Sequence, residues 1–210
     1  GTFLTEISDG DTTPRSTDGT LFASTAVGST YEMLVRVHND GDDSLSIGTR
    51  SFTGTNADQF GTVGFPSSGS IAAGGSVDFR IRFTPTSFGT KNATFSFGNG
   101  DSNENPFNFA IQALAEAPEI QVAGRGNDGV FRNISDGDTT PREPDGTDFG
   151  DTNVTGTGNE AQRTFRITNS GNVPLNIQGA TTITGPAAAD YDISGLFAGN
   201  PFVNIDAGKD

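Results

Sequence analysis

The chain repeats itself, and this repeat is the feature that most limits how it can fold. Residues 7–20 read ISDGDTTPRSTDGT and residues 134–147 read ISDGDTTPREPDGT, so twelve of the fourteen positions are identical at a spacing of 127 residues. Looser matches continue beyond, with Asn39-Asp40-Gly41 answering Asn169-Ser170-Gly171. Since each copy should form the same structural unit, the 210 residues predict two similar domains rather than one large fold.

The repeat also predicts where the two domains begin and end. We expect domain 1 over residues 1–117 and domain 2 over residues 118–210, joined by a short linker at 115–118 (AEAP). The segment 119–127 has no counterpart in the first copy, and the segment 77–114 has none in the second. We therefore expect domain 1 to lack a first strand and domain 2 to lack its last strands. Either the sequence belongs to a longer array of repeats, which we favour, or another chain supplies the missing strands.

Hydrophobic residues alternate with polar ones, which is typical of strands with one buried face. In 76–83 (SVDFRIRF) and 31–38 (YEMLVRVH) every second residue is apolar, and 93–97 and 107–111 follow the same pattern. Gly, Asp and Asn separate these runs at intervals of about 10–12 residues. The pattern predicts an all-β fold of tandem immunoglobulin-like, seven-stranded β-sandwiches, the second copy incomplete. The 17 Phe residues, against two Tyr and no Trp, are expected to fill the cores.

Charge and composition exclude several classes of function. Lys and Arg number 12 against 26 Asp and Glu, so the net charge of −14 disfavours nucleic acids and anionic membranes as partners. Cysteine is absent, His38 is the only histidine, and no apolar run has the length of a membrane span. Without cysteine, thiol chemistry is excluded. With a single histidine, a Ser-His-Asp triad is disfavoured, and we expect that the protein is not an enzyme.

Several segments together resemble one known family. They are EIQV (119–122), DGDTTP (9–14 and 136–141), DGTDFG (145–150), TFRITNSGNVPLNI (164–177), AAGGSVDFRIRFTPTSFGTKNATFSF (72–97) and GDSNENPFNFAI (100–111). Their order resembles the bacterial choice-of-anchor D repeat, which is similar to the ASH (ASPM, SPD-2, Hydin) branch of immunoglobulin-like domains. The resemblance implies a seven-stranded sandwich, export from a bacterial cell, attachment by a terminal anchor of unknown type, and no catalysis.

The acidic loops within the repeat are the best candidates for binding. Ca²⁺ takes 6–8 oxygen ligands, often from clustered aspartates, and each copy places two aspartates around a glycine and a third seven residues later. The candidate ligands are Asp9, Asp11, Asp18, Asp136, Asp138 and Asp145. The alternative is that these residues form hydrogen-bonded Asx turns around a proline. Loops usually diverge faster than strands, so the near-identity of these two indicates a shared constraint, whether an ion, a rigid turn or a contact between repeats.

Two functional hypotheses follow. The first is a non-catalytic structural module of an exported bacterial surface protein or extracellular filament. It would associate with neighbouring repeats or with itself, through strand donation at open sheet edges and with stiffening by Ca²⁺. The second is an adhesin that recognises a surface glycan or protein, for which Tyr191, Phe197 and Phe202 in the polar region 183–205 are candidates.

Overall fold

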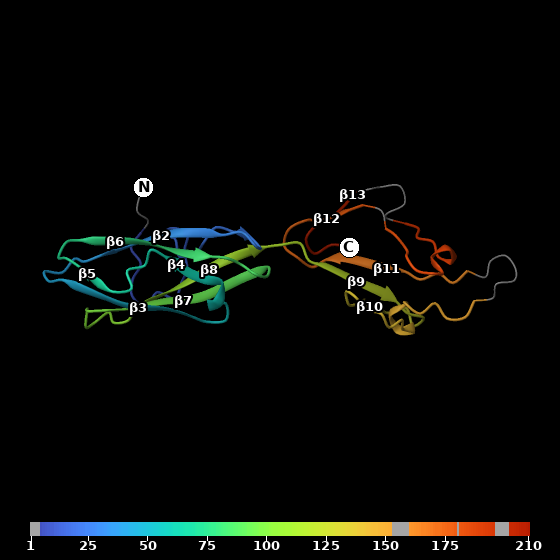
Figure 1. The fold of residues 1–210 in the computed structure, drawn as a ribbon, viewed down its shortest axis with the longest axis horizontal. Helices are drawn as coiled ribbons and strands as arrows, with labels where there is room; N and C mark the ends of the chain where they lie inside the picture. Colours follow the sequence, from blue (N-terminus) through green and yellow to red (C-terminus); the bar gives the residue numbers. More distant parts are fainter. Residues whose placement is uncertain (1–4, 153–159, 180, 196–201) are drawn as a thin grey trace. The chain divides into compact units, whose positions relative to one another are not determined.

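The computed structural model describes residues 5–152, 160–179, 181–195 and 202–210, and contains two compact units (Figure 1). Unit 1 is Gly1–Ala117 and unit 2 is Pro118–Asp210. Within the described residues, regular structure consists of strands and three single-turn 3₁₀ helices. None of the helices found there has the length and hydrophobicity needed to cross a membrane.

Unit 1 is a sandwich of two sheets (Figure 1). The larger sheet has the order β1-β8-β7-β3-β5 and the smaller one the order β2-β6-β4. All neighbours are antiparallel except β1 and β8, which run parallel. The strands are β1 (Thr25–Ala26), β2 (Tyr31–His38), β3 (Leu45–Thr53), β4 (Phe60–Val63), β5 (Gly69–Ile71), β6 (Ser76–Phe83), β7 (Gly89–Asn99) and β8 (Phe107–Glu116), and η1 (Ala57–Gln59) precedes β4.

Phenylalanine rings from both sheets fill the core of unit 1. In β6 the alternating residues Phe79, Ile81 and Phe83 are buried, and from the opposite sheet Phe95 and Phe109 are at most 1% exposed. The Phe79 and Phe95 rings meet across the interface with their centroids 5.6 Å apart. Burying such side chains on two facing sheets is the main source of stability in a sandwich. The expected alternation and the expected all-β, immunoglobulin-like sandwich fold are confirmed.

Unit 2 repeats parts of this plan with fewer strands in the residues described. One sheet has the order β10-β9-β11, and β12 pairs with β13. The elements are β9 (Ile120–Arg125), β10 (Phe131–Ile134), η2 (Glu143–Asp145), β11 (Phe165–Asn169), β12 (Leu175–Gln178), η3 (Ala188–Asp190) and β13 (Phe202–Ile205). The pair β12–β13 matches β3–β5, because Leu175 lies opposite Ile205 as Leu45 lies opposite Ile71.

A buried asparagine is placed identically in the two units. The Asn39 amide donates to the carbonyls of Asp43 and Ile71, at 2.8 and 2.9 Å. The Asn169 amide donates to the carbonyls of Val173 and Ile205, at 2.8 and 3.0 Å. Asn39 directly follows β2, and Asn169 is the last residue of β11. Each side chain links its strand, through hydrogen bonds, to the next turn and to a more distant strand. The sequence predicted turns at these positions, but not the buried side chain that organises them.

The expected linker at 115–118 is wrong for its first two residues. Strand β8 extends to Glu116, and Ala115 is fully buried and lies opposite both Thr25 and Gly89. Ala115 continues the inward series of Phe109, Ile111 and Ala113, but alanine carries too weak a hydrophobic signal to extend a predicted strand.

Candidate functional site: the repeated loop

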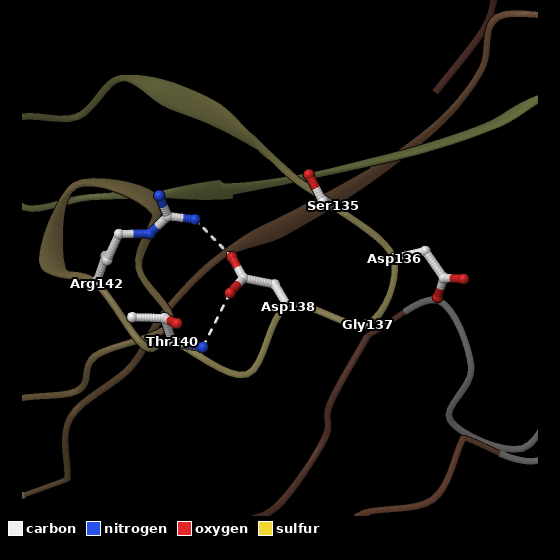
Figure 2. Close-up of a pocket in the computed structure, with 6 residues that line it drawn as sticks. All are labelled: Ser135, Asp136, Gly137, Asp138, Thr140 and Arg142. Atoms are coloured by element: carbon white, nitrogen blue, oxygen red, sulfur yellow. Dashed lines mark hydrogen bonds and ion pairs between the residues drawn. The ribbon is translucent and has the colours of Figure 1, made fainter.

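The repeated loop, residues 9–20 in unit 1 and 136–147 in unit 2, is organised around one arginine in each unit. In unit 2 the Asp138 carboxylate accepts a hydrogen bond from the Thr140 backbone N–H at 2.9 Å. Its second oxygen lies 2.5 Å from Nη2 of Arg142 (Figure 2). Nε of Arg142 also lies 3.2 Å from the Asp145 carboxylate. The guanidinium therefore joins two carboxylates that stand seven residues apart in the sequence.

A threonine completes the loop on the other side of Asp145. Thr147 donates its backbone N–H and its hydroxyl to Oδ1 of Asp145, at 3.1 and 2.5 Å. The backbone N–H of Arg142 in turn donates to the Thr147 hydroxyl at 2.8 Å. Gly146 closes the η2 turn at a φ of 73°, a conformation that glycine adopts without strain.

Unit 1 contains the same network. Asp11 accepts from the Thr13 N–H at 2.8 Å and pairs with Arg15 at 3.4 Å. Asp18 accepts from the N–H and hydroxyl of Thr20 at 2.9 and 2.5 Å, and lies 3.8 Å from Arg15. The constraint that keeps the two loops alike is thus visible as a set of hydrogen bonds and ion pairs that both share. Arg15 and Arg142 lie within the identical stretch, and that position was the sequence signal for their role.

These contacts alter the acidity of the unit 2 carboxylates. The Thr140 backbone N–H, and then the Arg142 guanidinium, lower the pKa of Asp138 below its ordinary value. The Thr147 hydroxyl is the main cause of a lowered pKa at Asp145. Each contact favours the ionised carboxylate, so both groups hold their negative charge at neutral pH.

The first aspartate of each loop differs between the units. In unit 1, Oδ1 of Asp9 accepts hydrogen bonds from the backbone N–H and side-chain amide of Asn108, at 2.8 and 3.3 Å. In unit 2, Asp136 makes no hydrogen bond or ion pair within the described part of the chain. Its carboxylate points away from Asp138 and Arg142 (Figure 2).

The loop in unit 2 lines a shallow hollow that is open to solvent. Ser135, Asp136, Gly137, Asp138, Thr140 and Arg142 surround it (Figure 2). Of its two carboxylates, that of Asp138 is bonded to Thr140 and Arg142 and that of Asp136 is not, and the hollow is too open to enclose a substrate.

The calcium prediction stays a prediction. Among the described residues, no three His, Asp or Glu side chains lie close enough together to hold a metal ion. Four of the six predicted ligands, Asp11, Asp18, Asp138 and Asp145, have an arginine as a partner. An ion at either loop would have to displace or rearrange that arginine.

The backbone of β9 brings the loop of unit 2 close to the sheet. A Cβ atom on Gly124 would lie 1.9 Å from the Asp145 carbonyl oxygen, and one on Gly126 would lie 2.5 Å from that of Pro144. Only glycine permits so close an approach of two backbones. The sequence does not indicate the role of these glycines, because AGRG (123–126) alone does not show which segment packs against it.

The only histidine and the described aromatic candidate for adhesion both lie about half exposed at the surface. The side chain of His38 is 48% exposed, and its Nε2 lies 3.1 Å from the Asp40 carboxylate. Tyr191 is 49% exposed, and its ring meets Phe149 edge-on with the centroids 5.5 Å apart. Phe197 and the Phe202 side chain lie outside the described residues.

Comparison with known proteins finds similarity only at the level of fold. No family model matches the sequence, and no curated protein matches it. The human CEP192 ASH/PapD-like domain 7 aligns with 48% of this chain and 83% of its own, at 16% identity and a TM-score of 0.35. SSP-19, an MSP-domain protein of Caenorhabditis elegans, aligns over 48% and 97%, at 15% identity and a TM-score of 0.33. The Escherichia coli chaperone DraB aligns over 45% and 58%, at 12% identity and a TM-score of 0.30.

Proposed function

We propose that the chain is a non-catalytic structural module of an exported bacterial surface protein or extracellular filament, in which tandem immunoglobulin-like units bear load. One observation carries the proposal. The most closely repeated residues, 7–20 and 134–147, form the same internally bonded loop in both units, held by Arg15 and Arg142. Because the carboxylates held by the two arginines bond within their own loops, we take the loops to have a structural role rather than a catalytic one.

The surroundings of His38 and of the repeated loop support a function without catalysis. A general base is usually partly enclosed and held by a second group so that its pKa suits the reaction. His38 is instead an exposed side chain at the end of β2, beside an aspartate that is itself 89% exposed. The hollow at the repeated loop is open, and the Arg142 guanidinium that lines it already pairs with the carboxylates of Asp138 and Asp145.

The resemblance to choice-of-anchor D repeats supports a bacterial origin, export and anchoring at the cell surface. The net charge of −14 suits a surface that stays soluble and repels nucleic acid. We propose neighbouring repeats or further copies of the module as its partners, because sandwich sheets have open edges. A glycan or protein ligand is the alternative.

Electron microscopy of the native material tests this function. We expect ordered fibres or arrays in which a bead the size of one unit recurs. Binding to a glycan array by a soluble monomer, without any ordered assembly, would favour the adhesin instead.

The same specimen treated with a chelator tests calcium. Order that survives chelation is expected if the arginine–aspartate network alone fixes the loops. Loss of order that added Ca²⁺ restores would establish that the ion stiffens the assembly.

A further inference from the structure

The two outward faces of unit 1 differ in charge. On the smaller sheet, the outward side chains of β2 and β6 include five charged groups that pair with one another: Glu32, Arg36, Asp78, Arg80 and Arg82. On the larger sheet, every described outward side chain of β7, and of the segments of β3 and β8 paired with it, is uncharged. We call this set the uncharged face. It consists of Ser51 and Thr53 of β3, Thr90, Asn92, Thr94 and Ser96 of β7, and Asn108, Ala110, Gln112 and Leu114 of β8.

Cross-strand pairing sets these side chains in rows. Thr94, for example, lies between Thr53 and Ala110. With a rise of about 3.4 Å per residue and a strand spacing of about 4.8 Å, the rows extend about 20 Å along the strands and about 10 Å across them. Charge begins only at the border, with Glu116 at the end of β8 and Asp9 on the neighbouring loop. Protein interfaces share this arrangement, in which charged residues are depleted at the centre and the rim is polar.

An amide pair near the middle of the face leaves a donor and an acceptor free. Nε2 of Gln112 donates to Oδ1 of Asn92 at 2.8 Å. Nδ2 of Asn92 and Oε1 of Gln112 have no partner within the described part of the chain. An identical pair turned through 180° offers the matching groups, because each free Nδ2 then meets the free Oε1 of the other pair.

Net charge limits where two copies of this chain can approach each other. Each copy carries a net charge of −14, so the two repel at long range. In a two-fold contact, residues near the axis meet their own counterparts, and a charged group there would face a like charge. The uncharged face brings no charge to such an axis. Its hydroxyl and amide groups both donate and accept hydrogen bonds, so the face is complementary to itself.

The composition of the face suits a protein copy better than a glycan or another small ligand. Small-ligand sites are usually concave and lined by apolar and aromatic side chains. The side chains of the uncharged face include no aromatic ring, and they follow the surface of a sheet.

The first strand of unit 2 indicates which sheet a preceding strand of unit 1 would join. β9 pairs with β11, which ends at Asn169, the counterpart of the Asn39 that follows β2. A strand placed in the same way before unit 1 would pair with β2 and so extend the smaller sheet. The uncharged face belongs to the other sheet and would stay as it is.

We propose that the uncharged face of unit 1 packs against the same face of a second copy of this chain, about a two-fold axis near Asn92 and Gln112. This contact rests on the proposed function, since it is the surface through which modules of the assembly would join side by side. So small a face gives a weak contact, because stable interfaces bury about 800 Å² on each partner. Weak contacts suffice between two arrays of modules, where each pairing raises the effective concentration of the next.

Sedimentation of the 210-residue chain at concentrations up to about 1 mM tests the contact. We expect a dimer with a dissociation constant of about 0.1–1 mM. We also expect the dimer fraction to rise as NaCl increases from about 0.05 to 0.5 M, because salt screens the repulsion between the two acidic chains. A contact made through the ion pairs of the smaller sheet would weaken over the same range of salt.

Opposite charges introduced at one position test the two-fold pairing. Gln112→Lys and Gln112→Glu each place like charges across the axis, and we expect each to weaken dimerisation at least about ten-fold. Gln112→Lys should do so although it makes the net charge less negative. An equimolar mixture of the two variants should dimerise again, because Lys then faces Glu, and this recovery would show that both are folded. Ser76→Lys, at an exposed position on the smaller sheet, is the control and should leave dimerisation unchanged.

Nuclear magnetic resonance locates the contact. We expect the side-chain amide signals of Asn92 and Gln112 to shift as the protein concentration rises. Four outcomes would overturn the inference: a monomer at about 1 mM, a dimer that weakens with salt, undiminished dimerisation of the Gln112 variants, and shifts confined to the smaller sheet or to unit 2. Shifts of the same amides on addition of dextran, without dimerisation, would assign the face to a neutral glycan instead.

Electron microscopy of native material keeps this contact separate from the proposed function. Ordered fibres together with a chain that stays monomeric would overturn the contact and leave the structural function standing. A dimer with the expected salt dependence, in material without ordered assembly, would support the contact and count against that function.

Discussion

At the scale of single residues, Arg142 shows how a side chain can account for a repeated sequence. Its guanidinium contacts Asp138 and Asp145, and Arg15 makes the equivalent contacts with Asp11 and Asp18. The sequence indicates that the loop is constrained, and it leaves an ion, a rigid turn or a contact between repeats open as the cause. It did not identify the arginine, because an ion pair across a turn depends on backbone angles that spacing alone does not fix.

The ion pair between Asp128 and Arg132 predicts that unit 2 loses stability in acid. Arg132, with help from the Val130 N–H, lowers the pKa of Asp128 to about 2 from its ordinary value of 3.8. Because the folded state favours the ionised form, this contribution to stability is complete above about pH 5 and is lost as the pH falls from 4 through 2. We therefore expect Asp128→Asn to be less stable than wild type at pH 5, and the difference to shrink towards pH 2.

Urea denaturation at several pH values measures this difference. Asp151→Asn removes an equal charge from an exposed position and serves as the control. A gap between Asp128→Asn and wild type that stays constant from pH 5 to pH 2 would contradict the pairing with Arg132.

Gly124 is the position where an added methyl group should be most disruptive, since its Cβ would overlap the Asp145 carbonyl oxygen. We expect Gly124→Ala to lower the free energy of unfolding of unit 2 by about 1–3 kcal/mol, as overpacking does. Gly61→Ala is the matched control, because Gly61 also lies in a strand but has no atom within 4 Å of the added methyl group. Similar denaturation midpoints for the two variants would show that the loop does not approach β9 so closely.

At the scale of elements, strands with strong alternation were predictable and those without it were not. β6, β2 and the centres of β7 and β8 follow from Phe, Ile and Val at every second position. β1 has two residues and is defined by its parallel partner, so no local pattern could indicate it. The sequence predicts a linker at the end of β8, because alanine and glutamate there are as typical of a loop as of a strand.

The buried asparagines link elements in a way that a variant can measure. The Asn169 side chain bonds to the Val173 and Ile205 carbonyls and accepts from the Gly171 and Glu119 N–H groups. Asn169→Ala would leave these groups without their partner, and we expect a loss of about 3 kcal/mol in chemical denaturation. Asn176→Ala, at an exposed position of β12, should change stability by less than about 0.5 kcal/mol. A small effect at Asn169 would mean that water replaces its bonds.

At the scale of the whole molecule, the two units differ in how much apolar surface they bury. The main hydrophobic cluster of described residues lies entirely in unit 1, whereas in unit 2 Ile120 and Phe165 are 52% and 44% exposed. Stability follows buried apolar area, so unit 2 should open first. Limited proteolysis should cut within 118–210 and leave a resistant fragment close to residues 1–117, identified by mass spectrometry. Equal cleavage of both units would contradict this order.

The two tyrosines of the chain fall one in each unit, and the sequence has no tryptophan. Tyr31 packs against Phe22 in unit 1, with ring centroids 5.8 Å apart, and Tyr191 packs against Phe149 in unit 2. The two tyrosines are therefore intrinsic fluorescence probes, one in each unit. Replacing either tyrosine with Phe removes the emission of one unit, so ultraviolet emission from the unlabelled chain then follows the unfolding of the other unit alone.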